Sequence, residues 1–384
     1  SRNKMKNYLI GLVILLLSSC SSPKTTIAEN EFEVSNKGIN KKQSELIFDY
    51  TKSFPNNTQL SIAIIKSGEI NFVGIERTND KIKFIENYKN VFEIGSITKV
   101  FTATLLSNFV NEQKLRLDDN IQDYLDFKIN TEKDITFKEL ANHTSGLTRM
   151  PSNFYTISNV LNEITGFGEN NPYKDYNEEK LIDFLKKDIE LNQEPGIKFE
   201  YSNLGFGILG FELAYISNSS YESLLQEKIF IKYEMESSTI NIENIRSELV
   251  KGLNPNGKTT ANWDLGALAG AGAIFSTAED LSKFALAQFD KENNELTLTQ
   301  KPTYKIDDDK QVGLGWHILK MENDRELVFH NGGTGGYRSS MGLDLENKNG
   351  IIILSNVSAF NEIDGNIDQL MFELIQTLYE TPSL

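Results

Sequence analysis

The order of strand-like and helix-like segments places the strongest constraint on how this chain of 384 residues can fold. Residues 59–66 and 69–76 carry alternating and β-branched residues around Ser67-Gly68, a pattern that predicts a β-hairpin. Helical patterns then fill the middle of the chain, at residues 96–114, 137–143, 178–187, 203–216 and 221–231. Strand-like runs return near the end, at residues 311–319, 326–330, 337–344 and 350–355.

Two further helices are predicted outside the middle region, at about residues 43–50 and 361–379. Another is expected to begin at a capping box, Ser276-x-x-Glu279, and to run to about Phe289. Strands at both ends of the chain favour an α+β fold in which they complete one antiparallel sheet. The N- and C-terminal helices would flank this sheet, and a mostly helical lobe, about residues 105–290, would be inserted.

The N-terminal segment is typical of an export signal. Basic residues precede a ten-residue apolar run, residues 8–17, which is followed by small residues. A bilayer-spanning helix needs about 20 apolar residues, so a membrane-spanning anchor is the weaker alternative. We therefore predict a signal peptide at residues 1–19, a polar flexible tether at 20–40 and one folded domain at 41–384.

Cys20 is the only cysteine of the chain and follows Leu17-Ser18-Ser19. This stretch resembles the lipobox of bacterial lipoproteins, in which the cysteine is lipidated. A lone thiol in an exported chain cannot form an intramolecular disulfide, and lipidation accounts for its presence. The expected location is a bacterial membrane, to which the exported protein is anchored by its lipid, facing the periplasm.

The formal net charge of −15 disfavours partners that bind through phosphate groups. An acidic surface repels nucleic acids and anionic lipid heads, so no nucleic acid partner is expected. Solubility alone also explains such a charge. Hydrophobic residues at 39% and charged residues at 24% are ordinary for a globular chain.

Ser96 and Lys99 form an S-x-x-K pattern at the start of a predicted helix. Residues three apart lie on one helix face. A serine hydroxyl becomes a good nucleophile when a neighbouring base takes its proton. Lysine can be that base if burial or nearby positive charge lowers its pKa from about 10.4. The alternative is a helix-capping serine followed by a solvated lysine.

Tyr201-Ser-Asn203 follows an extended stretch and precedes another predicted helix. Residues two apart in an extended segment project to the same side. A phenol held near an ammonium group would lose its proton more easily and could act as an acid for a leaving group. The alternative is a buried tyrosine followed by a helix-capping asparagine.

A glycine-rich stretch, residues 329–336, connects two predicted strands and contains His330-Asn331-Gly332-Gly333. Glycine allows a substrate to approach the backbone and to pair with a strand edge. A hairpin connection without a chemical role is the alternative. No phosphate-binding pattern can be written here. Residues 205–210 do spell G-x-G-x-x-G, but without a βαβ unit we interpret these glycines as close helix packing.

Together and in this order, the three elements resemble the motifs of the serine penicillin-binding protein and class C β-lactamase family. The resemblance extends from about residue 43 to 380 and includes Leu140-Ala-Asn-His-Thr-Ser-Gly-Leu147. It implies a β-lactamase/transpeptidase-like fold that needs no cofactor and no metal. It also implies that Ser96 attacks a carbonyl carbon to form an acyl-enzyme and that Lys99 shares its proton.

The resemblance assigns roles to the remaining motif residues. Tyr201 would relay a proton to the leaving group and activate the deacylating water, and Asn203 would hold a substrate amide. The backbone N–H groups of Ser96 and Gly333 would form an oxyanion hole. His330, Asn331 and Gly332 would bind substrate.

The third motif departs from the Lys-Thr-Gly that β-lactamases of this family commonly carry. His330 at the first position resembles certain DD-peptidase and esterase members, and Asn331 removes the hydroxyl. Arg338 could supply positive charge for a substrate carboxylate, or it could be an exposed strand arginine. Because the reference pKa of histidine is about 6.5, activity on carboxylate-bearing substrates is expected to decline as pH rises through neutrality.

Other hydrolase classes fit less well. The only histidines are His143, His317 and His330, and no G-x-S-x-G elbow occurs. We expect His143 to support the loop beside Ser96 and His317 to be structural. No zinc motif is present either.

The sequence thus predicts an exported serine hydrolase that cleaves amide bonds, β-lactamase-like or D-alanyl-D-alanine carboxypeptidase-like. A small-ester esterase is the alternative activity. A penicillin-binding sensor or cell-wall-binding lipoprotein without turnover is the alternative of another class. The substrate would be a β-lactam, a D-Ala-D-Ala peptide or an ester.

Overall fold

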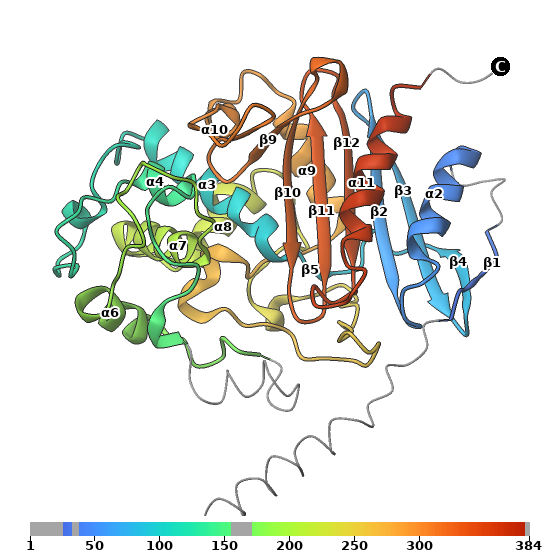
Figure 1. Cartoon of the computed structure of the whole chain (residues 1–384), viewed down its shortest axis with the longest axis horizontal. Helices are drawn as coiled ribbons and strands as arrows, with labels where there is room; N and C mark the ends of the chain where they lie inside the picture. Colours follow the sequence, from blue (N-terminus) through green and yellow to red (C-terminus); the bar gives the residue numbers. More distant parts are fainter. Residues whose placement is uncertain (1–25, 33–37, 155–170, 381–384) are drawn as a thin grey trace, which may run out of the picture.

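The computed structural model describes residues 26–32, 38–154 and 171–380. The predicted signal peptide and Cys20 lie outside these residues. The main feature is a ten-stranded sheet with the order β1-β4-β3-β2-β12-β11-β10-β9-β8-β7 (Figure 1). Its strands are β1 (Glu29–Asn30), β2 (Gln59–Lys66), β3 (Glu69–Thr78), β4 (Lys81–Ile85), β7 (Tyr304–Lys305), β8 (Lys310–Val312), β9 (His317–Lys320), β10 (Glu326–Gly333), β11 (Arg338–Asp344) and β12 (Asn349–Ser355).

Strands from the two ends of the chain meet where β2 pairs with β12. The pairing is antiparallel, with Leu60 opposite Ser355 and Ile65 opposite Gly350. This confirms the prediction that both strand groups complete one sheet. All neighbouring strands are antiparallel except β1 and β4, which run parallel.

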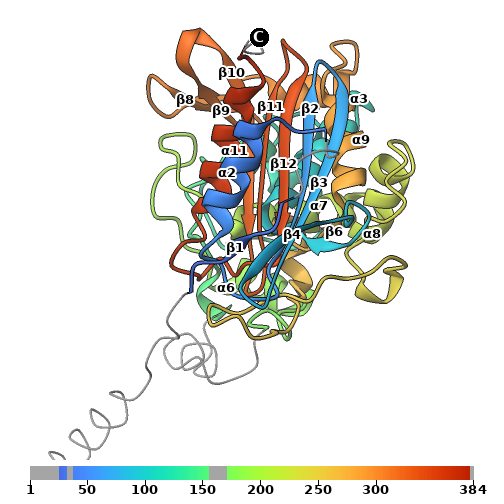
Figure 2. The same cartoon turned by 90° about the vertical axis from the view of Figure 1, so that its right-hand side faces the viewer.

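Helices cover both faces of the sheet. The first and last helices, α2 and α11, lie side by side on one face (Figure 2), whereas α9 packs against β2 and β12 on the other. No helix among the described residues has the length and apolar character needed to cross a membrane. The helices are α2 (Lys41–Thr51), α3 (Thr98–Asn111), α4 (Phe137–Ala141), α6 (Glu178–Lys187), α7 (Asn203–Ser217), α8 (Tyr221–Leu225), α9 (Ala278–Gln288), α10 (Asn294–Gln300) and α11 (Asn366–Thr377).

Alternation along the central strands divides the core into two layers. On β2, Ile62 belongs to the cluster beneath α2 and α11, whereas its neighbour Ala63 belongs to the cluster shared with the helical lobe. On β12, Ile351 and Ile352 are divided in the same way. Both faces are buried because successive side chains of a strand point to opposite sides.

The helical lobe is built around α7, which is apolar on nearly all sides and almost entirely buried. A Cβ atom at Gly207 would lie 2.4 Å from the Leu268 side chain, and one at Gly210 would lie 2.9 Å from Gly270. These contacts confirm that the glycines serve close packing. They hold α7 against the segment that contains Ala271, a residue of the site described below.

Part of the predicted tether, residues 20–40, belongs to the sheet. Glu29 and Asn30 form β1, and Ala28 is buried. The buried Arg77 guanidinium binds this segment through the backbone oxygen of Thr26, at 2.7 Å. The polar composition of residues 20–40 concealed this because the contacts that hold the segment, to Arg77 and between Phe32 and Phe84, are with residues far along the chain.

Several predicted boundaries need correction. The capping residue of α9 is Thr277, which accepts from the Asp280 N–H, because Ser276 belongs to the small two-stranded sheet of β5 (Phe92–Glu93) and β6 (Phe275–Ser276). The predicted strand 311–319 is two strands, β8 and β9, separated by a turn that contains Gly315. Several short strands and helices were not predicted, among them β4, β5, β6, β7 and α10.

Candidate active site

Ser96 lies in a single 3-10 turn, Gly95–Ile97, directly before α3. Its side chain caps neither the turn nor the helix, which excludes the capping alternative. Gly95 has φ +52°, a left-handed conformation that favours glycine. Ser96 is partly exposed, so a ligand can reach its hydroxyl from solvent.

Lys99 is fully buried one turn further along the chain. Its Nζ lies 3.1 Å from Ser96 Oγ, 2.8 Å from Asn203 Oδ1 and 2.7 Å from the backbone oxygen of Ala271. The solvated-lysine alternative is therefore wrong. The structure brings the first two sequence motifs together around one amine.

Burial lowers the pKa of Lys99 well below its ordinary value, and the positive charge of Arg149 adds to this effect. The site therefore favours a neutral amine, with two N–H donors and one lone pair. The oxygens of Asn203 and Ala271 accept the two N–H groups. The lone pair is then directed to Ser96, whose hydroxyl can donate to it.

Tyr201 and Asn203 flank Ser202, which is the capping residue of α7 and accepts from the Gly205 N–H at 2.8 Å. The capping residue is thus Ser202, which excludes the alternative of a helix-capping asparagine. The Tyr201 ring centroid lies 4.9 Å from Lys99 Nζ. Both flanking side chains face Lys99, as the two-residue spacing predicted.

The expectation that Tyr201 loses its proton easily is wrong. Burial raises the pKa of Tyr201 to about 12, against the opposing effects of a hydrogen bond with Ser96 and the charges of Arg149 and Arg338. Burial also disfavours the ammonium form of Lys99, which weakens the positive charge expected to stabilise a phenolate. At neutral pH the phenol is a proton donor.

His143 supports the Tyr201 segment. Its ring stacks on that of Tyr201 with centroids 4.4 Å apart, and its Nδ1 accepts from the Ser202 N–H at 3.1 Å. Burial lowers the pKa of His143 well below its ordinary value, so the ring is neutral and can accept this bond. His143 was expected to support the loop beside Ser96, whereas its contacts are with the Tyr201 motif.

Strand β10 lies against the turn that carries Ser96. A Cβ atom at Gly332 would lie 2.0 Å from the backbone oxygen of Ile94, and one at Gly95 would lie 2.6 Å from the backbone nitrogen of Gly333. Only residues without a side chain fit at this contact. The Gly333 N–H is thereby placed beside the Ser96 turn, and its role in an oxyanion hole stays a prediction.

The Asn331 side chain is not brought to the site. Its Nδ2 donates to Asp368 of α11 at 2.7 Å, on the opposite face of the sheet. The reason is strand alternation, because His330 on the preceding position faces Tyr201, with ring centroids 6.5 Å apart. The predicted substrate contact of Asn331 is therefore wrong for its side chain.

The His330 side chain is buried and is not exposed to solvent. Burial lowers the pKa of His330 well below its ordinary value, with smaller contributions from His317 and Lys99. The sequence predicted that His330 changes its charge near neutral pH. The lowered pKa favours the neutral ring in that range, so this prediction is corrected. His317, expected to be structural, lies beside it with ring centroids 5.3 Å apart.

Two site residues escaped the sequence analysis. Arg149 lies over the Tyr201 ring, and Glu93 of β5 accepts hydrogen bonds from Asn262 Nδ2 and the Trp263 N–H, both at 2.8 Å. Burial raises the pKa of Glu93 to about 7. Glu93 stands three residues before Ser96, but a single acid beside a motif carries no signal of its own. Arg149 is likewise a single charged residue, and no pattern around it in the sequence indicates a role.

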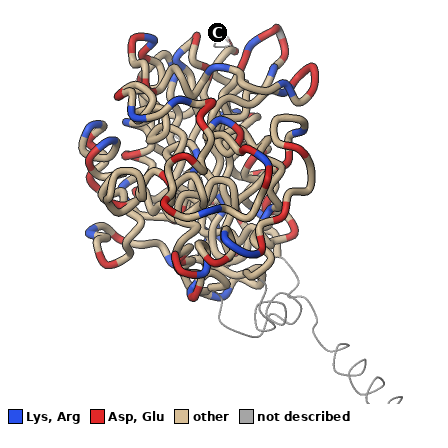
Figure 3. Tube along the Cα trace, turned by 90° about the vertical axis from the view of Figure 1, so that its left-hand side faces the viewer, with Lys and Arg blue, Asp and Glu red and all other residues tan. Residues whose placement is uncertain are grey.

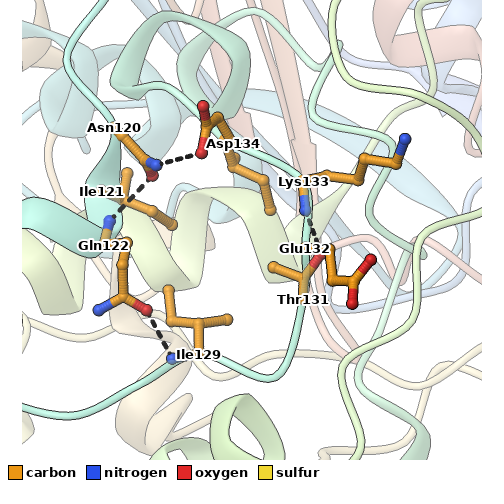
Figure 4. Close-up of a pocket in the computed structure, with 9 residues that line it drawn as sticks. Asn120, Ile121, Gln122, Ile129, Thr131, Glu132, Lys133 and Asp134 are labelled. Carbon is orange, nitrogen blue, oxygen red and sulfur yellow. Dashed lines mark hydrogen bonds between the residues drawn. The ribbon is translucent and has the colours of Figure 1, made fainter.

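Other parts of the described chain offer less. No group of three or more His, Cys, Asp or Glu residues within it is arranged to hold a metal ion. A small pocket is lined by residues 120–122, 129 and 131–135 (Figure 4). Its polar groups bind one another, as in the bond from Asn120 Nδ2 to Asp134 Oδ1 at 2.6 Å. None of the motif residues lines it.

Comparisons with known proteins find related chains. "Beta-lactamase-like protein 4" of Dictyostelium discoideum is 29% identical over 290 residues, which cover 68% of this chain and 46% of that protein. "Protein flp" of Staphylococcus aureus (strain MW2) is 26% identical over 320 residues, which cover 78% of this chain and 59% of that protein. The chain thus spans about half the length of the curated relatives that it matches.

Solved structures share the fold. The octameric penicillin-binding protein homologue from Pyrococcus abyssi has a TM-score of 0.72 and 23% identity, covering 89% of this chain and 78% of that one. The β-lactamase/D-alanine carboxypeptidase from Yersinia pestis complexed with citrate has a TM-score of 0.71 and 20% identity, covering 88% and 96%. At these identities the likeness concerns the fold alone.

The sequence model of the Beta-lactamase family matches residues 60–375, which is most of the chain. This match supports a serine hydrolase-like function. It contains all three motifs around Ser96, Tyr201 and His330. The chain belongs to the Beta-lactamase family.

Proposed function

We propose that this chain is a serine hydrolase that forms an acyl-enzyme at Ser96 and hydrolyses amide bonds, β-lactamase-like or D-alanyl-D-alanine carboxypeptidase-like. One observation carries the proposal. The buried Nζ of Lys99 lies 2.8 Å from Asn203 Oδ1, 2.7 Å from the backbone oxygen of Ala271 and 3.1 Å from Ser96 Oγ. Burial disfavours its charged form, and a neutral amine that donates to the first two oxygens has its lone pair left for the Ser96 hydroxyl. A neutral amine in that position is a general base.

In the first step, Ser96 Oγ attacks the substrate carbonyl carbon and its proton moves to Lys99 Nζ. The carbonyl oxygen becomes negative and is stabilised by the backbone N–H groups of Ser96 and Gly333. Each such donor is worth about 3 kcal/mol in hydrolases that use an oxyanion hole.

In the second step, the carbon–nitrogen bond breaks. The Tyr201 phenol donates its proton to the departing nitrogen, and the Lys99 ammonium returns a proton to the phenol. The acyl group stays on Ser96 as an ester. A water molecule then attacks this ester, its proton passes to Lys99, and the carbon–oxygen bond to Ser96 breaks as Oγ regains a proton. One water is consumed for each amide cleaved.

The substrate class draws support from the match of the Beta-lactamase family model to residues 60–375. A small-ester esterase is the second candidate, because the first residue of the third motif is His330, buried and with a lowered pKa, so it brings no charge to a substrate. The values of kcat/KM on nitrocefin, a diacyl-D-Ala-D-Ala peptide and p-nitrophenyl esters separate these activities on one preparation. A burst of acylation without steady product release would instead favour a sensor.

The first prediction concerns the nucleophile. Ser96→Ala should lose both turnover and labelling by a fluorescent serine-directed phosphonate, because no other hydroxyl among the described residues contacts Lys99 Nζ. Intact-mass measurement should find one phosphonyl group on the wild-type chain and none on the variant. Ser219→Ala, an exposed serine at the end of α7, is the matched control and should be labelled normally. Normal labelling of Ser96→Ala would contradict the proposal.

We also propose that the chain is exported and anchored to a bacterial membrane through a lipid on Cys20. The support is the arrangement of the N-terminal residues, a basic start, a short apolar run and Leu17-Ser18-Ser19 before the only cysteine.

A further inference from the structure

Three basic side chains contact the Tyr201 ring or influence its pKa, and two of them are already accounted for. Lys99 is buried and favours its neutral form. Arg338 is neutralised from α11 and the turn before it, where its guanidinium binds Asp368 at 2.5 Å and Asp364 at 3.3 Å. Arg338 is therefore not the free cation that the sequence left open. The remaining one is Arg149.

Arg149 is exposed, and its guanidinium carbon lies 5.0 Å from the centroid of the Tyr201 ring. Its backbone oxygen accepts from the N–H groups of Asn203 at 3.0 Å and Leu204 at 3.1 Å. The residue is thus tied to the same helix start that holds the second motif. Within the described part of the chain, no carboxylate forms an ion pair with it.

A guanidinium in this position suits an anionic ligand. Arginine stays charged at all physiological pH values, and its planar fork matches the two oxygens of a carboxylate. Stacking on an aromatic ring at an exposed site is a weak interaction and does not use the N–H donors at the edge of the fork. Those donors remain available to a ligand.

We propose that Arg149 binds a carboxylate on the leaving-group side of the substrate and so selects substrates with a carboxylate near the scissile bond. The inference rests on the proposed function, in which Tyr201 protonates the leaving group. Because Arg149 covers Tyr201, a carboxylate bound to it lies beside the departing atom. This side of the site would distinguish acyl amino acids and related anions from neutral esters and amides.

The test uses two esters that differ only in charge. One is the phenylacetyl ester of 3-hydroxybenzoate, and the other is the same ester of the neutral 3-hydroxybenzamide. The quantity measured is the ratio of kcat/KM for the anionic ester to that for the neutral ester. In Arg149→Gln this ratio should fall about tenfold or more, mainly through KM. Arg149→Lys should give an intermediate ratio, because it keeps the charge without the fork.

Arg246→Gln is the matched control, since it removes the same charge from another exposed position and should keep the wild-type ratio. Phosphonate labelling of each variant shows that its site is folded. An unchanged ratio in a labelled Arg149→Gln, or an equal loss on both esters, overturns the role of Arg149 alone. A wild-type chain that takes no label and hydrolyses neither ester overturns the proposed function itself.

Discussion

At the scale of single residues, burial determines which groups around Ser96 carry charge. Lys99 and His330 have pKa values held well below their ordinary values, and the pKa of Tyr201 is raised to about 12, in each case chiefly by burial. Burial penalises the charged form of every group, so an amine becomes a base and a phenol stays an acid. Neighbouring charges alone would not produce this combination.

The pH dependence of activity follows from these shifts. Burial lowers the pKa of His330 and favours its neutral ring, so we expect its charge to stay unchanged between pH 6 and 8. We expect kcat/KM on anionic and neutral substrates to follow parallel pH profiles there. His330→Gln should leave the shape of both profiles unchanged, as measured on the two phenylacetyl esters.

Glu93 is the residue to compare with His330, because burial raises the pKa of Glu93 to about 7, within the pH range of the test. A step near pH 7 that affects both esters equally should disappear in Glu93→Gln and persist in His330→Gln. A step on the anionic ester alone, lost in His330→Gln and kept in Glu93→Gln, would show that the imidazole does titrate.

At the scale of elements, α7 carries the second motif at its start and an unusual acid in its interior. Ser202 caps the helix, and Asn218 ends it in a left-handed conformation with φ 49°. Between them, Glu212 is fully buried, and neither of its carboxyl oxygens has a hydrogen-bond partner among the residues that the structure describes. Burial raises the pKa of Glu212 well above its ordinary value.

This raised pKa makes Glu212 a source of instability at neutral pH. The folded chain keeps a proton that the unfolded chain releases above about pH 4.3, so stability falls as pH rises from that point. Glu212→Met removes the unpaired group at similar volume. We expect it to raise the free energy of unfolding at pH 7 by about 1–3 kcal/mol and to reduce the loss of stability between pH 5 and 8.

Urea unfolding at both pH values measures this effect. Glu179→Met, at an exposed position of α6, is the control and should change stability little at either pH. A destabilised Glu212→Met with an unchanged pH dependence would mean that the carboxyl group has a stabilising partner in solution.

At the scale of the whole molecule, the sheet ties both ends of the chain to the site. The β2–β12 pairing joins the N-terminal hairpin to the strands that continue into β11 and β10. Strand β10 then reaches the Ser96 turn. Acidic and basic positions are interspersed along the loops on the side of the helical lobe (Figure 3). On this side of the molecule, the acidic residues behind the net charge of −15 are therefore not confined to one segment.

The proposed anchor acts on the molecule as a whole. In a bacterial host fed an alkyne-labelled palmitate, the wild-type chain should take up the label and sediment with membranes. Cys20→Ser should lose the label and appear in the soluble fraction, because Cys20 is the only thiol available. Phosphonate labelling at Ser96 should be the same in both chains. Labelled lipid on Cys20→Ser would end the proposal.

The sequence by itself determined the features that depend on near neighbours in the chain. Periodicity located the hairpin, the helices and the late strands, because alternation and helical spacing are local properties. The three-residue spacing of Ser96 and Lys99 placed their side chains on one face for the same reason. The order of the three motifs was enough to indicate the family.

Only the tertiary structure decided which of these groups are charged and where their side chains point. Asn331 turns to Asp368, Arg338 is paired with two aspartates, and Arg149 is left without a carboxylate among the described residues. Each of these outcomes depends on residues far apart in the sequence. Burial and charge pairing are set by neighbours in space, and a local pattern contains no record of them.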